Sequence, residues 1–206
     1  MSFRLASATP ISKLREGMRT LEKGMTRYTA NLGLLNLRKE LSNYMNRKYG
    51  LDYHPENEII VTVGGSEAID IGIRALVNPG DEVLIVEPCF VAYSPIVELT
   101  GGIPVPIPTK AENKFRLTGA ELREKITPKT KLLILPFPNN PTGAVMRREN
   151  LEEIASVLRE TNVMVLSDEI YAELTYGRKH VSIANIPGMY ERTIVVNGFS
   201  KSHAMT

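Results

Sequence analysis

The sequence predicts an α/β fold, in which a mostly parallel sheet carries helices on both faces. Short β-branched runs alternate with helical patterns, and most of these runs are continuously apolar. Strands buried on both faces have such continuous runs, whereas half-buried strands alternate polar and apolar residues. The alternation of strands and helices implies right-handed crossovers and a doubly wound sheet. The predicted strands are Glu58–Val63, Glu82–Val86, Ile103–Ile107, Lys131–Leu135, Val163–Leu166 and Thr193–Val196.

Apolar stripes at helical spacing predict the helices between these strands. Leu34–Tyr49, Glu67–Val77 and Glu149–Thr161 each carry apolar residues three to four positions apart. Thr118 and Glu121 form a T-x-x-E capping box, which predicts that a further helix begins there.

The beginning of the chain differs from the rest in that it holds one amphipathic helical pattern, Ile11–Glu22, and no strand. We therefore expect residues 1–27 to form an N-terminal helical segment and residues 28–206 to form one domain. No linker composition or internal repeat interrupts that domain.

Composition excludes several classes of function. Of the 206 residues, 43% are hydrophobic and 23% are charged, which is typical of globular proteins and not of disordered ones. The formal net charge of +2 gives no indication of a nucleic-acid partner. One cysteine excludes an internal disulfide framework and a zinc site built on several cysteines. Because no run approaches the roughly 20 apolar residues of a membrane span, and no secretory signal is evident, we expect a cytoplasmic protein.

In a doubly wound sheet the ligand lies at the carboxyl ends of the strands, so the residues that follow each predicted strand are candidates for a site. Gly64, Gly65, Ser66 and Glu67 follow the first predicted strand and precede a helix. Glycines let the backbone approach a ligand, and free N–H groups at a helix start bind phosphate. The alternative is a tight turn capped by Ser66.

Two further predicted strands are followed by an aromatic ring and by an amide. Phe90 follows the strand 82–86, where it can stack on a planar ligand or fill the core. Asn140 lies in the string PNNPTG and precedes a proline, which holds it out of the helical region and permits a cis peptide. Its amide can donate to a ligand oxygen or form an Asx-turn.

The last two predicted strands lead to a carboxylate, a phenol and a lysine. Asp168 directly follows a buried strand, where an unpaired carboxylate is costly. Tyr171 lies three residues later, which places both side chains on the same side of a helical turn. The alternative role of Asp168 is to cap a helix. Lys201 stands between two serines, either as a Schiff-base lysine or as a solvated charge, while His180 and His203 are interpreted as ordinary polar residues.

With these residues in view, the sequence resembles the class I/II aminotransferases, which are fold-type I enzymes dependent on pyridoxal 5′-phosphate (PLP). The strings PNNPTG at 138–143, SDEIY at 167–171 and NGFSKSHAMT at 197–206 carry the resemblance. YTANLGLLNLRKEL at 28–41 and TVGGSEAIDIGIRALVNPGDEV at 62–83 extend it over nearly the whole chain. The resemblance implies that residues 28–206 are the PLP-binding large domain.

The resemblance assigns a role to each residue that would face the PLP ring. It implies that Lys201 attaches PLP covalently and later acts as the base at the substrate α-carbon. It implies that Asp168 keeps the pyridine nitrogen protonated, so that the ring acts as an electron sink. Asn140 and Tyr171 are implied to donate hydrogen bonds to the ring oxygen, and Phe90 to stack on the ring.

The resemblance also assigns the residues around the phosphate group. Gly65, Ser66 and Glu67 match positions whose backbone amides hold the phosphate, and Ser200 matches one that adds a hydroxyl. Tyr28 matches a tyrosine that reaches the phosphate in the other subunit, which implies a homodimer with a shared site.

The chain departs from the family pattern at several places. It stops at Met205 and Thr206, where the family continues with Gly-Trp-Arg, and the family's small C-terminal domain is absent. Gly198 stands where a serine is often found. The antiparallel strand that the family inserts beside Glu58–Val63 is also missing, which would leave a gap in the sheet. We therefore expect these residues to be a fragment.

The function implied by the resemblance is transfer of an amino group between an amino acid and a 2-oxo acid. Related β-lyases, decarboxylases and synthases share the fold, although the lyases commonly carry histidine at the position of Tyr171. A remnant that binds PLP without catalysis is a further alternative. A nucleotide-binding α/β protein using Gly64 and Gly65 would leave Asp168 and Lys201 unexplained.

Overall fold

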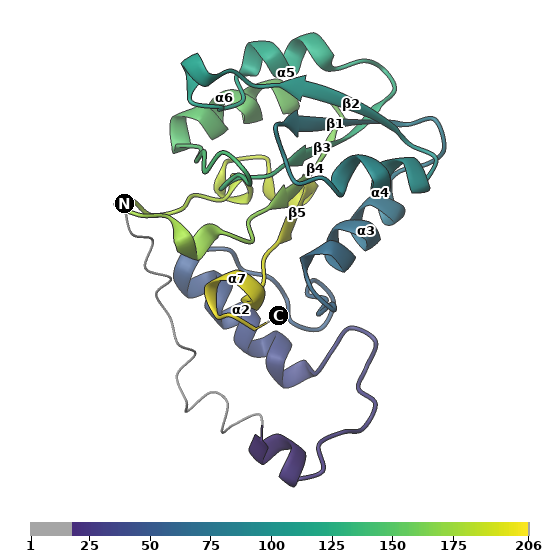
Figure 1. Ribbon diagram of the computed structural model, residues 1–206, viewed down its shortest axis with the longest axis vertical. Coiled ribbons are helices and arrows are strands. Elements are labelled where there is room, and N and C mark those ends of the chain that lie inside the picture. Colours follow the sequence, from purple (N-terminus) through teal and green to yellow (C-terminus); the bar gives the residue numbers. More distant parts are fainter. Residues whose placement is uncertain (1–17, 206) are drawn as a thin grey trace.

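The computed structural model describes residues 18–205 and contains a five-stranded sheet of order β2-β1-β3-β4-β5 (Figure 1). Every neighbouring pair of strands is parallel, which confirms the predicted sheet. The apolar runs of β1, β3 and β4 are continuously buried, as expected for strands covered on both faces, whereas β2 and β5 at the two ends of the sheet are less buried. The strands are β1 (Glu82–Glu87), β2 (Ile103–Pro108), β3 (Thr130–Leu135), β4 (Met164–Asp168) and β5 (Thr193–Val196).

The helices predicted from apolar stripes and from the capping box are confirmed. They are α2 (Leu35–Tyr49), α3 (Gly65–Leu76), α5 (Gly119–Lys125) and α6 (Arg148–Leu158). The side chain of Thr118 accepts from the backbone N–H of Glu121, which closes the capping box. Sequence analysis did not predict α4 (Tyr93–Leu99). Pro95 occupies the first turn of this helix, where its missing N–H is tolerated. A short helix, α7 (Phe199–Ser202), follows β5.

The helices cover both faces of the sheet, and two separate apolar clusters hold them there. Helices α5 and α6 pack through Leu122 and Ile154 against residues of one face, such as Leu133 in β3. Helices α3 and α4 pack through Ile73 and other apolar residues against the opposite face, which includes Leu132. Because successive strand residues point to opposite faces, one apolar run in β3 supplies both clusters.

The predicted strand Glu58–Val63 is wrong. Its backbone joins no ladder of the sheet formed within residues 18–205, and Val61 N–H instead donates to the Leu32 carbonyl at 3.0 Å. Ile60 and Val63 are exposed. An apolar, β-branched run forms a strand only when a neighbouring strand supplies its hydrogen bonds. The sheet of the described residues ends at β5, and residues 58–63 pair with none of its strands.

The predicted N-terminal helix Ile11–Glu22 begins outside the described residues. Its last part is helical over residues 18–22. The division of the chain between residues 27 and 28 stays a prediction.

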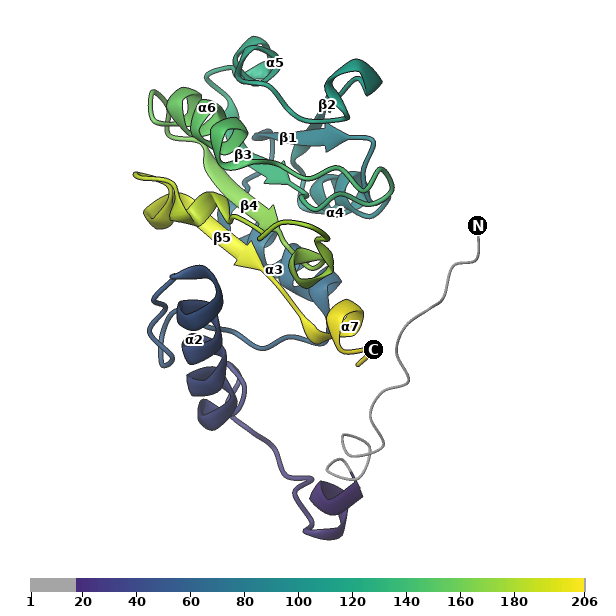
Figure 2. The same cartoon turned by 90° about the vertical axis from the view of Figure 1, so that its left-hand side faces the viewer.

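Helix α2 lies beyond β5, away from the two helical layers (Figure 2). Met45 of α2 packs with Leu51 and Ala184 in a third apolar cluster. The segment after β4 reaches this helix through the Glu173 carboxylate. Its oxygens accept from the Tyr44 hydroxyl at 2.5 Å, the Tyr49 hydroxyl at 2.8 Å and the Lys48 ammonium at 3.0 Å. Burial alone would raise the pKa of Glu173, but these three donors outweigh it and lower the pKa to about 2.

We expect Glu173→Gln to lower the free energy of unfolding by about 2 kcal/mol, because the bonded carboxylate is lost. Since the pKa of Glu173 is lowered in the folded state, its contribution is fully present above the ordinary value of 4.5. It disappears as the pH falls towards about 2. Chemical denaturation across this pH range measures the difference, with Glu124→Gln on exposed α5 surface as the control. A difference that does not shrink in acid would contradict this account.

Candidate active site

A cavity of about 250 Å³ opens at the carboxyl ends of the strands, beside the start of α3. Its lining residues come from segments after β1, β3, β4 and β5, as the predicted fold requires. The structure brings together most of the residues singled out in the sequence. Those that line the cavity are Gly65, Ser66, Phe90, Asn140, Asp168, Tyr171, Ser200 and Lys201.

The first turn of α3 forms one wall of the cavity. Gly64 precedes the helix with a φ of 90°, a conformation that side-chain-bearing residues rarely adopt. No side chain caps the helix start, and Ser66 lies inside the first turn, so the alternative role of Ser66 as the cap is wrong. The N–H groups of the first turn have no acceptors within the helix, and they carry the positive end of its dipole. This wall can therefore bind an anionic group.

Two predicted site residues do not line the cavity. The Glu67 carboxylate turns back and accepts a hydrogen bond from the Val63 N–H. Tyr28 is fully exposed, in the segment that precedes α2. Glu67 can contribute its backbone N–H to the α3 wall, but its side chain serves to close the turn before the helix.

Asp168 is the buried acid of the cavity, and 8% of its surface is exposed. Oδ2 accepts from the Tyr93 hydroxyl at 2.7 Å, and Oδ1 accepts from the Ile170 N–H at 3.1 Å. Burial raises the pKa of Asp168, while these two hydrogen bonds oppose the rise. Both donors are neutral, so the carboxylate retains a strong preference for a cationic group offered from the cavity.

The predicted helical turn between Asp168 and Tyr171 is wrong. Asp168 is the last residue of β4, and Tyr171 immediately precedes the 3₁₀ turn Ala172–Leu174. Both residues nevertheless reach the cavity. The turn is held by the Asp168–Ile170 hydrogen bond, so the carboxylate shapes its own loop as well as the cavity wall.

The two asparagine side chains of the PNNPTG turn have different roles. Asn139 is buried, donates to the Pro88 carbonyl at 3.1 Å and accepts from the Thr142 N–H at 3.1 Å. Asn139 therefore forms the Asx-turn that was the alternative for Asn140. Asn140 is exposed to the cavity, and its bond to Pro141 is cis. Asn139 thus builds the turn, and the Asn140 side chain stays available to a ligand.

Lys201 reaches the cavity from α7, and its Nζ lies 5.8 Å from the centre of the Tyr171 ring. Phe90 packs against the core cluster beneath α3 and α4 and also lines the cavity, so its predicted stacking on a planar ligand stays a prediction. Its ring meets that of Tyr93 edge to face, with 5.8 Å between the centroids.

Gly198, one departure from the family pattern, lies close to the Ile170 side chain. A Cβ atom at this position would lie 2.7 Å from Cδ1 of Ile170, closer than real contacts allow. A serine here would require the Ile170 side chain to move, and Ile170 itself lines the cavity.

Sequence analysis missed Tyr93, the residue that donates to Asp168. Its position three residues after Phe90 was the available signal, but the contact joins residues 75 positions apart and depends on α4.

Among residues 18–205, no group of three or more His, Cys, Asp or Glu side chains could hold a metal ion. No helix in the same range is long and apolar enough to cross a membrane.

Comparison with known proteins identifies the family. Residues 3–206 match the family described as aminotransferase class I and II, and the chain belongs to this family. Aromatic-amino-acid aminotransferase 2 of Thermococcus litoralis is 48% identical over 90% of this chain and 48% of its own length. Aspartate aminotransferase of Pyrococcus abyssi is 46% identical over the same shares. The predicted resemblance is therefore confirmed.

Solved structures confirm the predicted fold, that of the fold-type I large domain. An aromatic aminotransferase from Pyrococcus horikoshii OT3 matches with a TM-score of 0.94 at 44% identity. That match covers 97% of this chain and 54% of the other. The chain thus spans about half the length of the relatives that it matches.

We expect Tyr93→Phe to lower the free energy of unfolding by about 1–3 kcal/mol, because it leaves a buried carboxylate oxygen without its donor. It should also raise the pKa of Asp168 further, since the Tyr93 bond lowers that pKa. Chemical denaturation and carboxyl NMR titration measure the two effects. Tyr176→Phe removes an exposed hydroxyl and serves as the control. Equal stability of the two variants would contradict the importance of the Tyr93–Asp168 bond.

Proposed function

We propose that this chain forms the PLP-binding part of an amino-acid aminotransferase. One observation carries the proposal: a buried carboxylate, a lysine and a helix N-terminus face the same cavity in a member of this family. Asp168 supports a protonated pyridine nitrogen, because burial makes its charge costly unless a cation is close by. The α3 wall with Gly65 and Ser66 supports a phosphate.

The other lining residues fit the same cofactor. Asn140 and Tyr171 supply an amide and a hydroxyl that can donate to the ring oxygen, and Phe90 supplies an apolar ring for stacking. Ser200 adds a hydroxyl for the phosphate. When bound, PLP supplies an electron sink for the negative charge that develops at the substrate α-carbon.

The chain's own residues would bind the cofactor and move the proton. Lys201 Nζ would hold PLP, and as a free amine it would act as the base that takes the proton from the substrate α-carbon. Asp168 would accept a hydrogen bond from the pyridine nitrogen, and its negative charge would keep that nitrogen protonated. The Tyr171 ring beside Lys201 Nζ limits where the released amine can move.

We further infer amino-acid and 2-oxo-acid substrates and a homodimer with a shared site. Aspartate and aromatic amino acids are the first candidates, because they appear in the names of the relatives. The exposure of Tyr28 supports its predicted role at a partner's phosphate. The exposed Met18, Leu21 and Met25 support an interface in the same region. We infer a cytoplasmic location because a single cysteine cannot form the internal disulfides that are common in secreted proteins.

The experiment combines cofactor trapping with a test of the reaction. We expect borohydride to fix PLP to Lys201, as measured by peptide mass mapping, and Lys201→Ala to lose both the trapped peptide and the visible absorbance band. The PLP-loaded chain should convert aspartate or an aromatic amino acid to the 2-oxo acid, and Lys201→Ala should abolish this conversion. Lys179→Ala, which changes a lysine outside the cavity lining, is the matched control.

Two results would count against the proposal. Trapping of PLP on surface lysines, with no preference for Lys201, would overturn the cofactor site. Specific trapping at Lys201 without formation of a 2-oxo acid from any amino acid tested would leave a PLP-binding chain and overturn the catalytic part of the proposal.

A further inference from the structure

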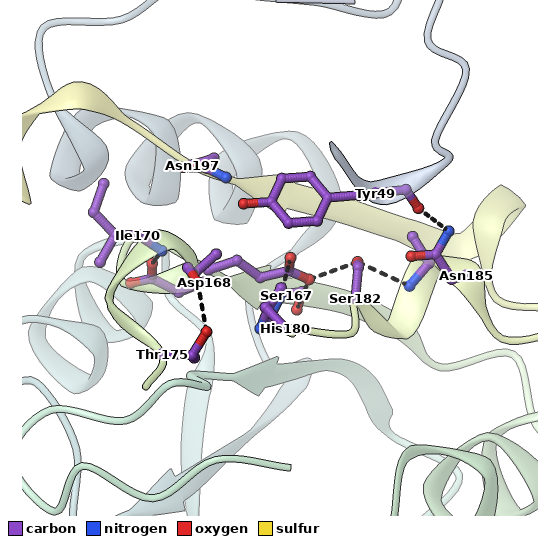
Figure 3. Close-up of polar contacts among 12 residues, drawn as sticks. Tyr49, Ser167, Asp168, Ile170, Thr175, His180, Ser182, Asn185 and Asn197 are labelled. Atoms are coloured by element: carbon purple, nitrogen blue, oxygen red, sulfur yellow. Dashed lines mark hydrogen bonds and ion pairs between the residues drawn. The ribbon is translucent and has the colours of Figure 1, made fainter. Parts of the chain in front are cut away.

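Directly behind the cavity lies a second buried acid, Glu169, of which 1% is exposed. Its Oε1 accepts from the Ser167 hydroxyl at 2.9 Å and the Ser182 hydroxyl at 2.6 Å. Its Oε2 lies 2.7 Å from Nε2 of His180, whose side chain is 8% exposed. Sequence analysis took His180 for an ordinary polar residue, but the structure buries it against this carboxylate. Figure 3 shows His180 and Ser182 gathered beside Ser167.

This network faces away from the cavity. Asp168 and Glu169 are consecutive, and Asp168 lines the cavity whereas Glu169, His180 and Ser182 do not. The network therefore does not contact a ligand in the cavity. It joins the end of β4 to residues 180–182, so it closes the base of the loop that carries Tyr171.

The main chain of Glu169 makes a second connection. Its N–H donates to the Val196 carbonyl at 2.8 Å, at the end of β5. The following residues lead through Gly198 to Lys201. Glu169 therefore connects three parts of the site. Its side chain bonds to His180 and Ser182 at the base of the loop, and its backbone N–H bonds to the end of β5. Its own peptide bond joins it to Asp168.

A buried carboxylate is costly unless its oxygens are fully hydrogen-bonded, so this arrangement resists displacement. Moving Glu169 would break its bonds to Ser167, Ser182 and His180 together. The same displacement would turn Asp168 with respect to the cavity, because the two residues share a peptide bond.

We propose that Glu169 and His180 form a positioning pair that fixes Asp168 and Tyr171 with respect to the cavity. The inference rests on the proposed PLP site, in which Asp168 meets the pyridine nitrogen. The pair acts through Asp168 and touches neither cofactor nor substrate.

The first test uses the cofactor-free chain. Glu169→Gln keeps the shape of the side chain but removes its charge. We expect faster amide hydrogen exchange in peptides covering residues 164–182. Glu153→Gln is the matched control, because Glu153 is an exposed carboxylate on α6 that accepts from the Gly119 N–H and lies outside the measured peptides. If Glu169→Gln does not fold, Ser167→Ala removes one donor and should give the same change at smaller amplitude.

The second test is a double-mutant cycle on the Kd of PLP, measured by titration. We expect Glu169→Gln to raise the Kd about fivefold or more in the unsubstituted chain. In an Asp168→Asn background the same substitution should change the Kd by less than about twofold, because the charge that it positions is already gone. A role in general stability alone would give the same factor in both backgrounds.

The outcomes separate this inference from the proposed function. Failure of the unsubstituted chain to bind PLP would overturn the proposed function and this inference with it. Unchanged hydrogen exchange, an unchanged Kd in Glu169→Gln, or equal effects in the two backgrounds would each overturn the positioning role while leaving the PLP site in place.

Discussion

The carboxylate of Asp168, buried at the end of a fully covered parallel strand, is the constraint on which the rest of the site depends. Burial raises the pKa of Asp168, and two neutral donors, Tyr93 and the Ile170 N–H, offset only part of that cost. A buried carboxylate of this kind favours a cation in the cavity, and the proposed protonated ring nitrogen would supply one. Helix α4 through Tyr93, the loop after β4 through Ile170, and the cavity wall all meet at this one group.

Parallel pairing brings the remaining parts to the same place. The carboxyl ends of β1, β3, β4 and β5 all lie at one end of the sheet, so an aromatic ring, an amide, a carboxylate and a lysine meet at one cavity although they are far apart in the sequence. Helix α3 adds an unpaired N-terminus at the same end. Two carboxylates then hold the loop after β4 from behind: Glu169 through His180, and Glu173 through α2.

The parallel sheet was predictable because strands buried on both faces leave continuous apolar runs in the sequence. Most of the cavity lining was predictable because the fold places residues that follow the strands together. The structural state of Glu58–Val63 was not, since a strand needs a neighbour to pair with. The sequence could not tell which of Asn139 and Asn140 builds the turn and which faces the cavity, because only the geometry of the turn distinguishes two adjacent asparagines. The Tyr93–Asp168 bond depends on a distant contact with no local signature.

The most direct test of the central claim is a crystal structure of this chain with PLP. The account predicts density continuous with Lys201 Nζ, the phosphate against the first turn of α3 and the pyridine nitrogen within hydrogen-bonding distance of an Asp168 oxygen. PLP bound in the cavity with its ring nitrogen turned away from Asp168 would contradict the account. So would a cavity that stays empty while PLP modifies lysines elsewhere on the surface.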